Sequence, residues 1–480
     1  MKPRLKVLGK EELDTIYTTA LYLLKKVGVN IEDEGIIKLL ANNGCDVDSN
    51  RIVYFPEWLV RDCLNSTPKE VTLCGRNPSC DMQVGRQKYP YIIPLVSYNY
   101  FDCVSNTYRT PTKDDVARFV RLCDHLSTVN GVWMLSMIPE FEDMYMFGDF
   151  ILGIRNTTKP VCVINFEPKS VEPTYQLAVE MAGGEDELKR RPLLTVNYCC
   201  ISPLIWNKEG CAMLKATARW GIIPAISTEA PMGDTGPVTV AGDIAQKMAE
   251  FLSGAVVLQL LNRGMPIIWV DVHETFDQKT GAVNFASHGN FLYACAIGQI
   301  EEYLGIPIVT PVIPDSKLLD LQESYELGFL LLTQMLGGSR LVVTHGLDSS
   351  RAFNNELLLL LDDMVTATQR ILDGIEVNSD TLAVEVIEKV CRKIDGKRRV
   401  GHFLDQRHTL NWYAKEHRPR KDGIFEKHRR EKWMELGSKS FTQRAHEKVE
   451  EILSTHKPEP LPREVEQKIA ELQKKYQIKV

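Results

Sequence analysis

The sequence predicts a (β/α)8 barrel, an α/β fold known as the TIM barrel, and two features carry this prediction. Between residues 91 and 374, eight short apolar runs alternate with eight amphipathic helical stretches, as in a parallel sheet with helices outside it. No G-x-G-x-x-G turn opens any of these helices, which disfavours an open dinucleotide-binding sheet. An N-terminal helical extension and a C-terminal helical arm flank the barrel.

Each predicted strand is short and apolar, as expected for strands buried on both faces. The strands are expected at Tyr91–Val96, Val132–Met137, Pro160–Phe166, Pro192–Tyr198, Ile222–Ile226, Pro266–Val272, Pro307–Ile313 and Arg340–Val343. The helices are expected at Lys113–Leu126, Phe141–Ile154, Val171–Met181, Lys208–Trp220, Gly242–Leu261, His288–Leu304, Leu318–Leu336 and Ala352–Leu372. Pro94 interrupts the first strand and cannot donate a hydrogen bond there, so this strand is the least regular.

Two segments flank the predicted barrel, which spans residues 91–374. Residues 1–90 are predicted to form a small extension, with helices at Glu11–Val27, Ile36–Asn43 and Pro56–Asn65 and short strands at Val71–Leu73 and Met82–Val84. Residues 375–480 are predicted to form a basic helical arm, in which KPEPLP at 457–462 marks a linker. We expect the last helix, Arg463–Tyr476, to pack on the barrel or on a second subunit.

Charge is distributed unevenly along the chain. Residues 391–480 carry 23 Lys and Arg against 14 Asp and Glu, whereas the first 390 residues carry 34 against 49. A basic tail on an acidic body favours docking of the tail on its own barrel over binding of an acidic partner. The twelve cysteines include no C-x-x-C pair, and Cys123, Cys162 and Cys295 lie in apolar surroundings. This usage is typical of buried thiols in a reducing cytosol.

Neither a membrane nor a nucleic acid is an expected partner. The N-terminal sequence MKPRLKVLGK lacks an apolar signal core, and no segment approaches the roughly 20 apolar residues that span a bilayer. We therefore expect a soluble, cytoplasmic protein. The basic C-terminal arm makes a homo-oligomer the expected assembly.

The stretch Ile222–Val240, IIPAISTEAPMGDTGPVTV, is typical of a strand that leads into a functional loop. Its apolar run breaks into a polar segment in which Gly233 and Gly236 let backbone approach a ligand closely. In barrels, ligands bind on the loops that follow the strands. Those loops hold many acids but one lysine, Lys317, and the acids are Glu140, Glu167, Glu229, Asp271, Glu274, Asp315 and Asp348.

An acidic mouth with interleaved aromatic rings suits a cation, because Coulomb attraction adds to cation–π contacts worth about 0.5–2 kcal/mol per ring. The cation cage is expected to consist of Tyr98, Phe166, Tyr198 and Glu229. Further substrate-binding residues are expected at Met232, His273, Asp315, Lys317 and Asp348. For each acid, the alternative is pairing with helix N-termini and loop amides.

Metal and nucleophile interpretations have less support, and we expect no bound metal. Asp271 and His273 have ligand-like spacing, but the first strand lacks the H-x-H of metal-dependent barrel hydrolases. Cys199 and Cys200 resemble thiolate zinc ligands, although neighbouring strand residues point to opposite faces. No phosphate-binding loop follows the last two strands. A Cys199–His345 nucleophile pair stays open beside the alternative of an inert buried thiol.

Several stretches, in the same order along nearly the whole chain, resemble the trimethylamine methyltransferase superfamily. They are VGVNIEDEGIIKLLANNGCDVD near the start, ISPLIW at 201–206, APMGDTGPVTVAG at 230–242, PDSKLLDLQESYE at 314–326, DGIEVNSDTLAVEVI at 373–387 and GHFLDQRHT at 401–409. The resemblance implies a (β/α)8 barrel that passes a methyl group from an amine to the cobalt of a separate corrinoid protein.

One departure from that superfamily bears on the substrate. Its founding members carry pyrrolysine, whose electrophilic imine is thought to bind the amine, whereas all 480 residues here are ordinary amino acids. We place the corresponding region around Ser316–Lys317. A quaternary ammonium has no lone pair to add to an imine, and its positive nitrogen already activates the methyl group. The resemblance therefore implies a quaternary amine, such as glycine betaine, proline betaine or carnitine.

The implied reaction is direct displacement, in which Co(I) attacks in line with the C–N bond and a tertiary amine leaves. The chain lacks the D-x-H-x-x-G signature of a corrinoid-binding domain, so we expect the corrinoid (cobalamin) on a partner and no cofactor on this chain. Glu229, Asp271 and His345 are the expected catalytic residues. Lys317, His345 and His273 are expected to hold a substrate carboxylate. A non-catalytic betaine-binding barrel and a zinc-dependent barrel methyltransferase or hydrolase stay open as alternatives.

Overall fold

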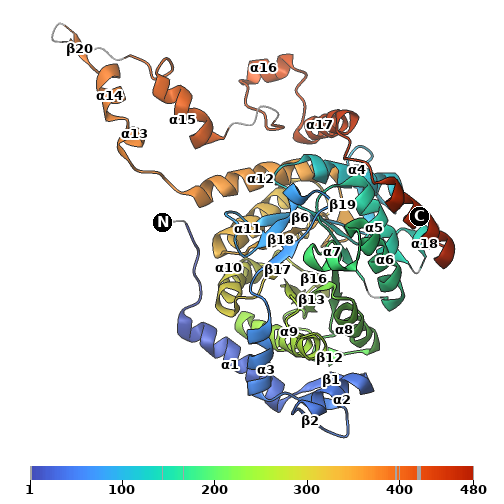
Figure 1. The fold of residues 1–480 in the computed structure, drawn as a ribbon. Helices are drawn as coiled ribbons and strands as arrows, with labels where there is room; N and C mark the ends of the chain where they lie inside the picture. Colours follow the sequence, from blue (N-terminus) through green and yellow to red (C-terminus); the bar gives the residue numbers. More distant parts are fainter. Residues whose placement is uncertain are drawn as a thin grey trace.

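Eight parallel strands close into a barrel in the computed structural model, which describes residues 3–478 apart from 143, 166, 395–396, 399–400 and 419–422 (Figure 1). The strands are β6 (Tyr91–Val96), β9 (Val132–Met134), β10 (Val161–Ile164), β11 (Thr195–Cys199), β13 (Ile223–Glu229), β14 (Ile268–Val272), β17 (Ile308–Val312) and β18 (Leu341–Thr344). Strand β18 pairs with β6 and closes the sheet. The predicted (β/α)8 barrel is confirmed, and β6 has the predicted bounds in spite of Pro94.

Helices surround the barrel in the predicted alternation. They are α4 (Lys113–His125), α5 (Tyr145–Asn156), α6 (Val171–Ala182), α8 (Lys208–Trp220), α9 (Val240–Leu261), α10 (His288–Leu304), α11 (Leu321–Gly337) and α12 (Asn355–Asp373). Short elements in the connections are α7 (Glu185–Arg190) and the 3-10 turns Pro78–Cys80, Pro139–Phe141 and Pro168–Ser170. Gly298 of α10 lets this helix approach α11 closely, because a Cβ there would lie 2.6 Å from the Gly337 carbonyl oxygen.

One end of the barrel is closed by a hairpin, which leaves the other end as the mouth. The hairpin consists of β4 (Val71–Leu73) and β5 (Met82–Val84). Its apolar side chains join those of Ile93, Ile223, Ile268 and Leu341, near the starts of the strands, in one inner cluster. The open end is therefore the carboxyl-terminal end of the strands, where barrel ligands bind.

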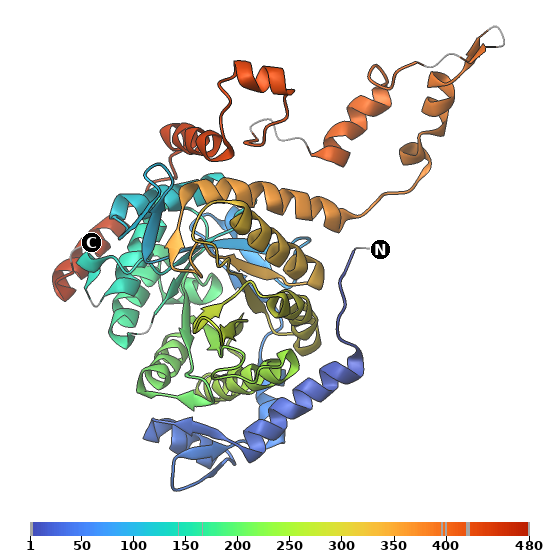
Figure 2. The same ribbon diagram turned by 180° about the vertical axis from the view of Figure 1, so that it is seen from behind.

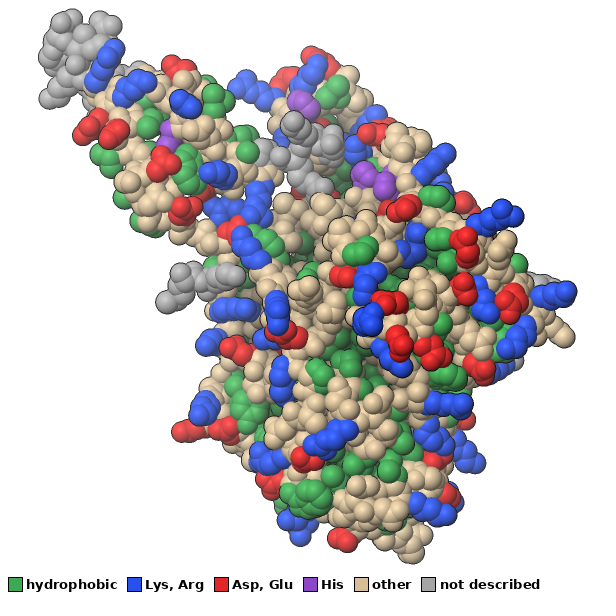
Figure 3. Space-filling model, in the orientation of Figure 1, with side chains coloured by type: hydrophobic (Ala, Val, Ile, Leu, Met, Phe, Trp, Pro, Cys, Tyr) green, Lys and Arg blue, Asp and Glu red, His purple; other side chains and the backbone are tan. Residues whose placement is uncertain are grey.

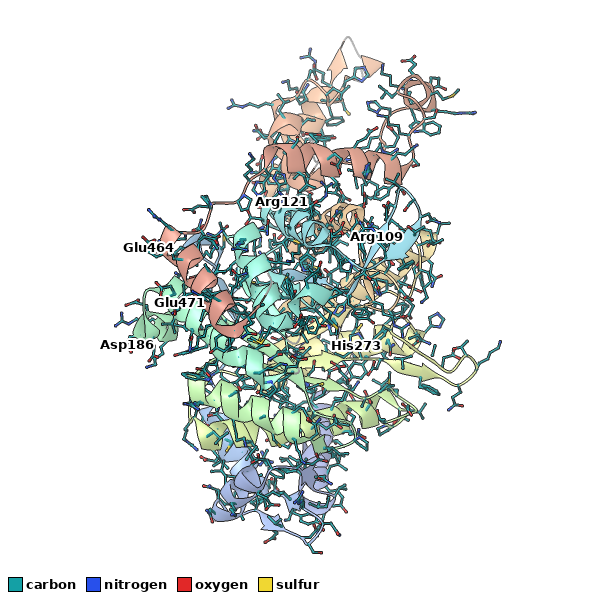
Figure 4. All side chains as sticks on the ribbon, turned by 90° about the vertical axis from the view of Figure 1, so that its right-hand side faces the viewer. Arg109, Arg121, Asp186, His273, Glu464 and Glu471 are labelled. Atoms are coloured by element: carbon teal, nitrogen blue, oxygen red, sulfur yellow. The ribbon has the colours of Figure 1, made fainter. Side chains whose placement is uncertain are left out.

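Small elements stand around the mouth, which faces the viewer in Figure 2. A three-stranded sheet is formed by β7 (Asn99–Asp102), β8 (Thr107–Arg109) and β19 (Ala352–Phe353), and a hairpin by β15 (Thr275–Asp277) and β16 (Ala282–Asn284). Arg109 ties β8 to α4 through two hydrogen bonds to the Asp115 carboxylate, at 2.6 and 2.8 Å. Figure 4 shows the β15–β16 hairpin projecting from the body beyond His273.

The N-terminal extension packs on one side of the barrel. Its elements are α1 (Lys10–Lys26), β1 (Val29–Ile31), α2 (Glu34–Asn42), β2 (Asp46–Val47), β3 (Ile52–Tyr54) and α3 (Glu57–Ser66). Strand β12 (Ile205–Trp206), from the barrel, pairs with β1, and helices α1 and α3 cover α9. We expected no segment long and apolar enough to span a bilayer, and helix α9 corrects this expectation. Its 22 residues and mean hydropathy of 1.3 are sufficient by length and composition to cross a membrane. In this fold, however, 83% of the apolar window is buried.

The C-terminal arm has two parts with different packing. Its elements are α13 (Ser379–Leu382), α14 (Val384–Val390), β20 (Lys393–Ile394), β21 (Lys397–Arg398), α15 (Arg407–His417), α16 (Arg430–Glu435), α17 (Phe441–Thr455) and α18 (Arg463–Tyr476). Helix α17 packs on α4 and α12, and α18 packs on α6 with Val465, Ile469 and Leu472 buried. The predicted docking of the last helix on the barrel is thus confirmed, whereas α13–α15 project away from the body (Figures 1 and 2).

Candidate active site at the barrel mouth

Glu229, the last residue of β13, faces the inside of the mouth. Ile223 and Ala225 belong to the inner cluster, so Ser227 and Glu229 continue the same face of the strand. Glu229 is exposed, unlike the rest of β13. Protein surrounds the carboxyl on its other sides, and burial raises its pKa, opposed by a hydrogen bond with Ser227 and by the charge of Lys247. The mouth therefore presents an accessible acid in a poorly solvated place.

Several of the inward-facing side chains around Glu229 are apolar. Leu135, Ile164 and Val272 pack against the inner cluster from the ends of three other strands, and each is half-buried. Cys199 lies one strand from Glu229, since it pairs with Ser227 in the sheet. Burial, and then the Glu229 charge, raise the pKa of the Cys199 thiol, which disfavours a nucleophilic thiolate.

A second carboxyl group, that of Glu274, interacts with Glu229 from the loop after β14. Burial first, and then the charge of Glu229, raise the pKa of Glu274 to about 8. The Met232 N–H donates to the Glu274 carbonyl at 2.9 Å, and the Phe276 N–H donates to the Met232 carbonyl at 3.0 Å. Met232, a predicted substrate-binding residue, is 2% exposed and instead joins the two loops that carry the carboxyl groups.

Behind β14 lies a buried ionic cluster, centred on Lys247 of α9, that the sequence analysis missed. Lys247 and Asp243 are fully buried, with 2.8 Å between Nζ and Oδ2. The same Nζ donates to the Val272 carbonyl at 2.6 Å. Lys247 also lowers the pKa of Glu274 through its charge, against the larger effect of burial. A signal was present in the sequence, because Lys247 is the one basic residue of the largely apolar helix α9 and follows the acidic residue Asp243 by four positions.

Asp271 and His273 belong to this cluster and not to the mouth. Asp271 alternates with the inner-cluster residue Val270, so its side chain leaves the barrel and accepts from the Tyr293 hydroxyl at 3.1 Å. The His273 ring stacks on the Tyr293 ring with 5.2 Å between centroids. Burial raises the pKa of Asp271 to about 7 and lowers that of His273 to about 3. Their placement contradicts the predicted direct roles of Asp271 in catalysis and of His273 in binding a substrate.

The predicted aromatic cage is only partly assembled. Tyr198 lies on the outer face of β11, is 1% exposed, and its hydroxyl is 3.0 Å from the Thr217 hydroxyl of α8. It cannot reach the mouth, so this prediction is wrong. Tyr98 lies two residues after the end of β6 and is 36% exposed, so its role in the cage stays a prediction. Phe166 lies outside the described residues.

The loop after β18 adopts an uncommon conformation beside the mouth. Asp348, Ser349 and Ser350 have φ angles of 56°, 53° and 75°, a left-handed run without glycine. Hydrogen bonds hold it, because the Ser350 hydroxyl lies 2.5 Å from His345 Nδ1 and the Ser349 hydroxyl donates to Asp315 at 2.8 Å. Burial lowers the pKa of His345 to about 3, so its ring is neutral at neutral pH.

Lys317, Asp315 and Asp348 lie together on the rim with partners of their own. Lys317 Nζ is 3.1 Å from Asp348 Oδ1, and the lysine side chain is 60% exposed. Asp315 accepts from the N–H groups of Phe285 and Ala286 at 2.9 Å each. The alternative of pairing with loop amides therefore describes Asp315, whereas Lys317 is accessible to a substrate.

The described residues give no support to a metal site. Within them, no group of three or more His, Cys, Asp or Glu side chains is arranged to hold an ion. Cys200 faces away from Cys199, with its sulfur 3.7 Å from Glu250 Oε2. Adjacent positions on β11 thus point to opposite faces, and the two thiols do not share a site.

The closed barrel and its inward-facing carboxyl group define a (β/α)8-barrel protein whose candidate small-molecule site lies at the strand ends. The trimethylamine methyltransferase (MTTB) family matches residues 1–478, and the chain belongs to this family. The predicted resemblance is confirmed.

Two similar proteins come from Desulfitobacterium hafniense. A trimethylamine methyltransferase is 28% identical over 95% of this chain and 90% of its own length, and a glycine betaine methyltransferase is 25% identical over 97% and 96%. Among solved structures, the monomethylamine methyltransferase of Methanosarcina barkeri covers 92% of this chain and 94% of its own, at 15% identity and a TM-score of 0.48.

Proposed function

We propose that this chain removes a methyl group from a quaternary amine, such as glycine betaine, proline betaine or carnitine, and passes it to the corrinoid of a partner protein. The Glu229 carboxyl group carries this proposal, because it is an accessible acid among apolar inward-facing side chains. A methylammonium group is both cationic and apolar at its surface, which suits such a place. The names of the two Desulfitobacterium relatives, a trimethylamine and a glycine betaine methyltransferase, support a methylated amine as the substrate.

The proposal of a quaternary amine as the substrate depends on the absence of pyrrolysine from this sequence. The chain has only ordinary residues and therefore no pyrrolysine imine to which an amine lone pair could add. A quaternary ammonium needs no such addition, since its nitrogen is already positive. Recognition then requires an anionic group and apolar contacts, which Glu229 with Leu135, Ile164 and Val272 would supply.

The roles of these residues follow from how charge changes in the reaction. The ammonium loses its positive charge as the C–N bond breaks, so Glu229 attracts the bound substrate more strongly than the transition state. We therefore assign the mouth's main contribution to positioning, with Leu135, Ile164 and Val272 contacting the methyl groups and excluding water. The partner's corrinoid would supply the nucleophile that accepts the methyl group. All twelve cysteines are free thiols, which supports a cytoplasmic site for the reaction.

Methyl transfer from a panel of quaternary amines to Co(I) cobalamin tests the proposal. We expect one betaine-type compound to drive the absorbance change of Co(I) in the presence of the protein. Tight binding of a betaine without methyl transfer would instead identify a non-catalytic betaine-binding barrel. Neither binding nor transfer with any member of the panel would overturn the proposal.

Substitution of Lys317 tests which side of the rim contacts a substrate carboxylate. We expect Lys317→Ala to weaken glycine betaine binding by about 2- to 5-fold and to leave choline binding nearly unchanged. The effect is small because Asp348 already neutralises part of the lysine charge at 3.1 Å. Isothermal titration with the two ligands measures it, and equal losses for both would remove Lys317 from this role.

A further inference from the structure

The projecting part of the C-terminal arm, residues 375–418, lacks a core of its own. Nine of its large apolar side chains are at least 46% exposed, among them Ile375, Leu404 and Leu410 at 89%, 84% and 75%. Within the described residues of this segment, only Val390 is buried. Figure 3 shows hydrophobic side chains along the projection, which is the upper left part of the molecule. A soluble monomer rarely exposes so many apolar groups together, so this surface is typical of an interface.

The projection is attached to its own body mainly at its base. Arg418 and Arg370 form ion pairs with Asp373 and Glu416 there. Farther out, the Trp412 indole donates to Asp380 at 3.1 Å, which joins α15 to α13 without covering their apolar side chains. The projection thus has a defined shape and an unoccupied apolar face.

The same chain also exposes a second apolar surface, on α10 and α11. Leu321 is 89% exposed and Leu292 is 51% exposed, and Tyr325 and Phe329 are 47% and 48% exposed. The Tyr325 and Phe329 rings are in contact in a tilted arrangement, with 4.8 Å between centroids, so these two rings form one continuous apolar surface. Both exposed apolar surfaces, the projecting arm and the α10–α11 patch, belong to the same chain. The arm of one copy can therefore cover the patch of a second copy, and the reverse.

We propose that the projecting arm of each copy packs on the α10–α11 patch of a second copy, in a reciprocal two-fold dimer. Area supports a stable contact, because nine partly exposed side chains offer about 500–900 Å² per arm, and two arms with two patches reach the roughly 1,200–2,000 Å² of specific interfaces. A two-fold arrangement is also the commonest closed symmetry.

The second copy fits this surface better than the corrinoid partner does. The arm leaves the barrel sideways, outside the outline seen along the barrel axis, and so does not stand over the mouth (Figures 1 and 2). A partner that delivers a nucleophile to Glu229 has to approach the mouth itself. The projecting arm lies outside that approach, and the patch that it would cover belongs to the outer helices α10 and α11 and not to the inside of the mouth.

Light scattering coupled to size exclusion tests the dimer without any substrate. We expect wild-type protein at micromolar concentration to have twice the 54.4 kDa mass of the chain. Leu404→Asp with Leu410→Asp, and separately Tyr325→Asp with Phe329→Asp, should each give monomers with unchanged circular dichroism. Val104→Asp is the matched control, because Val104 is 73% exposed but lies on neither surface, and it should leave the dimer intact.

Mixing the two monomeric variants provides the sharper test. A mixed pair retains one intact arm and one intact patch that face each other, so we expect it to associate, although more weakly than wild type. A wild-type monomer, a dimer that survives the arm substitutions, or a larger arm-dependent assembly would overturn the reciprocal exchange. An arm that instead binds the corrinoid protein would overturn it too. None of these results depends on methyl transfer.

Discussion

Replacing Glu229 by glutamine is expected to weaken binding of the quaternary amine by about 30-fold or more. The substitution keeps the size and shape of the side chain but removes the negative charge at the end of β13. Bound substrate would cover the exposed Glu229 carboxyl group, and loss of one partner from such a covered charge pair costs about 2–5 kcal/mol. The fall in kcat/KM should be smaller than the loss of binding, because Glu229 attracts the charged ground state more strongly than the transition state. Titration of the ligand and the Co(I) cobalamin assay measure the two effects.

A matched control distinguishes the effect of losing the Glu229 charge at the site from the effect of losing any one negative charge of the protein. Glu180 is an exposed residue of α6, on the outer layer of the barrel, and Glu180→Gln should stay within about 2-fold of wild type. Thermal unfolding should show that Glu229→Gln is as stable as wild type or more stable, because the variant no longer holds a carboxyl group whose pKa burial has raised. Unchanged binding in a folded Glu229→Gln protein would remove the central residue of the proposed function.

Much of the barrel is predictable from the sequence because its strands are short, apolar and regularly spaced. Helix α10 has the predicted bounds, and so has β6. Proline and glycine mark most of the element ends. Strand β13 shows the limit of this pattern, because it continues from the apolar run through Ser227 and Thr228 to Glu229. Hydrogen bonding to β14 extends the strand there, and composition does not reveal such pairing.

The direction of each side chain could not be predicted. Parallel strands buried on both faces have apolar residues at every position, so the sequence does not indicate which alternate set points inward. Asp271 and Glu229 illustrate the difficulty, since both are acids near the end of a strand that begins with an apolar run, yet only Glu229 faces the mouth. The same ambiguity affects Tyr198. Packing against α8 turns the Tyr198 side chain outward, and packing against α10 turns the Asp271 side chain outward.

Glu274 and Lys247 give the site a property that neither residue suggests alone. One buried ammonium group is shared among Asp243, Asp271 and Glu274, whose pKa values are all raised by burial, to about 6, 7 and 8. The carboxyl groups outnumber the lysine, so part of the cluster is protonated in the free protein at neutral pH. A cation that enters beside Glu229 changes this balance, because its charge favours the ionised forms of both Glu229 and the neighbouring Glu274, whose pKa is about 8 in the free protein.

Binding of the quaternary amine at pH 7 is therefore expected to release close to one proton, mainly from Glu274. Below a pH of about 8 the free protein holds this proton, and the cation has to displace it. Affinity should rise as the pH increases toward 8, by up to about 10-fold per unit, and level off above it. Titration calorimetry in two buffers of different ionisation enthalpy counts the protons.

Two variants locate the released proton within the cluster. Glu274→Gln should abolish both proton release and the rise of affinity with pH, whereas Asp271→Asn, on the outer face of β14, should retain most of both. Lys247→Met would leave Asp243 unpaired in the interior, so the double variant Asp243→Asn with Lys247→Met is the better test of the lysine. The double variant should shift the pH dependence slightly upward, because the charge of Lys247 lowers the pKa of Glu274 more than the charge of Asp243 raises it. A pH-independent affinity in the wild-type protein would show that Glu274 is not coupled to the bound cation.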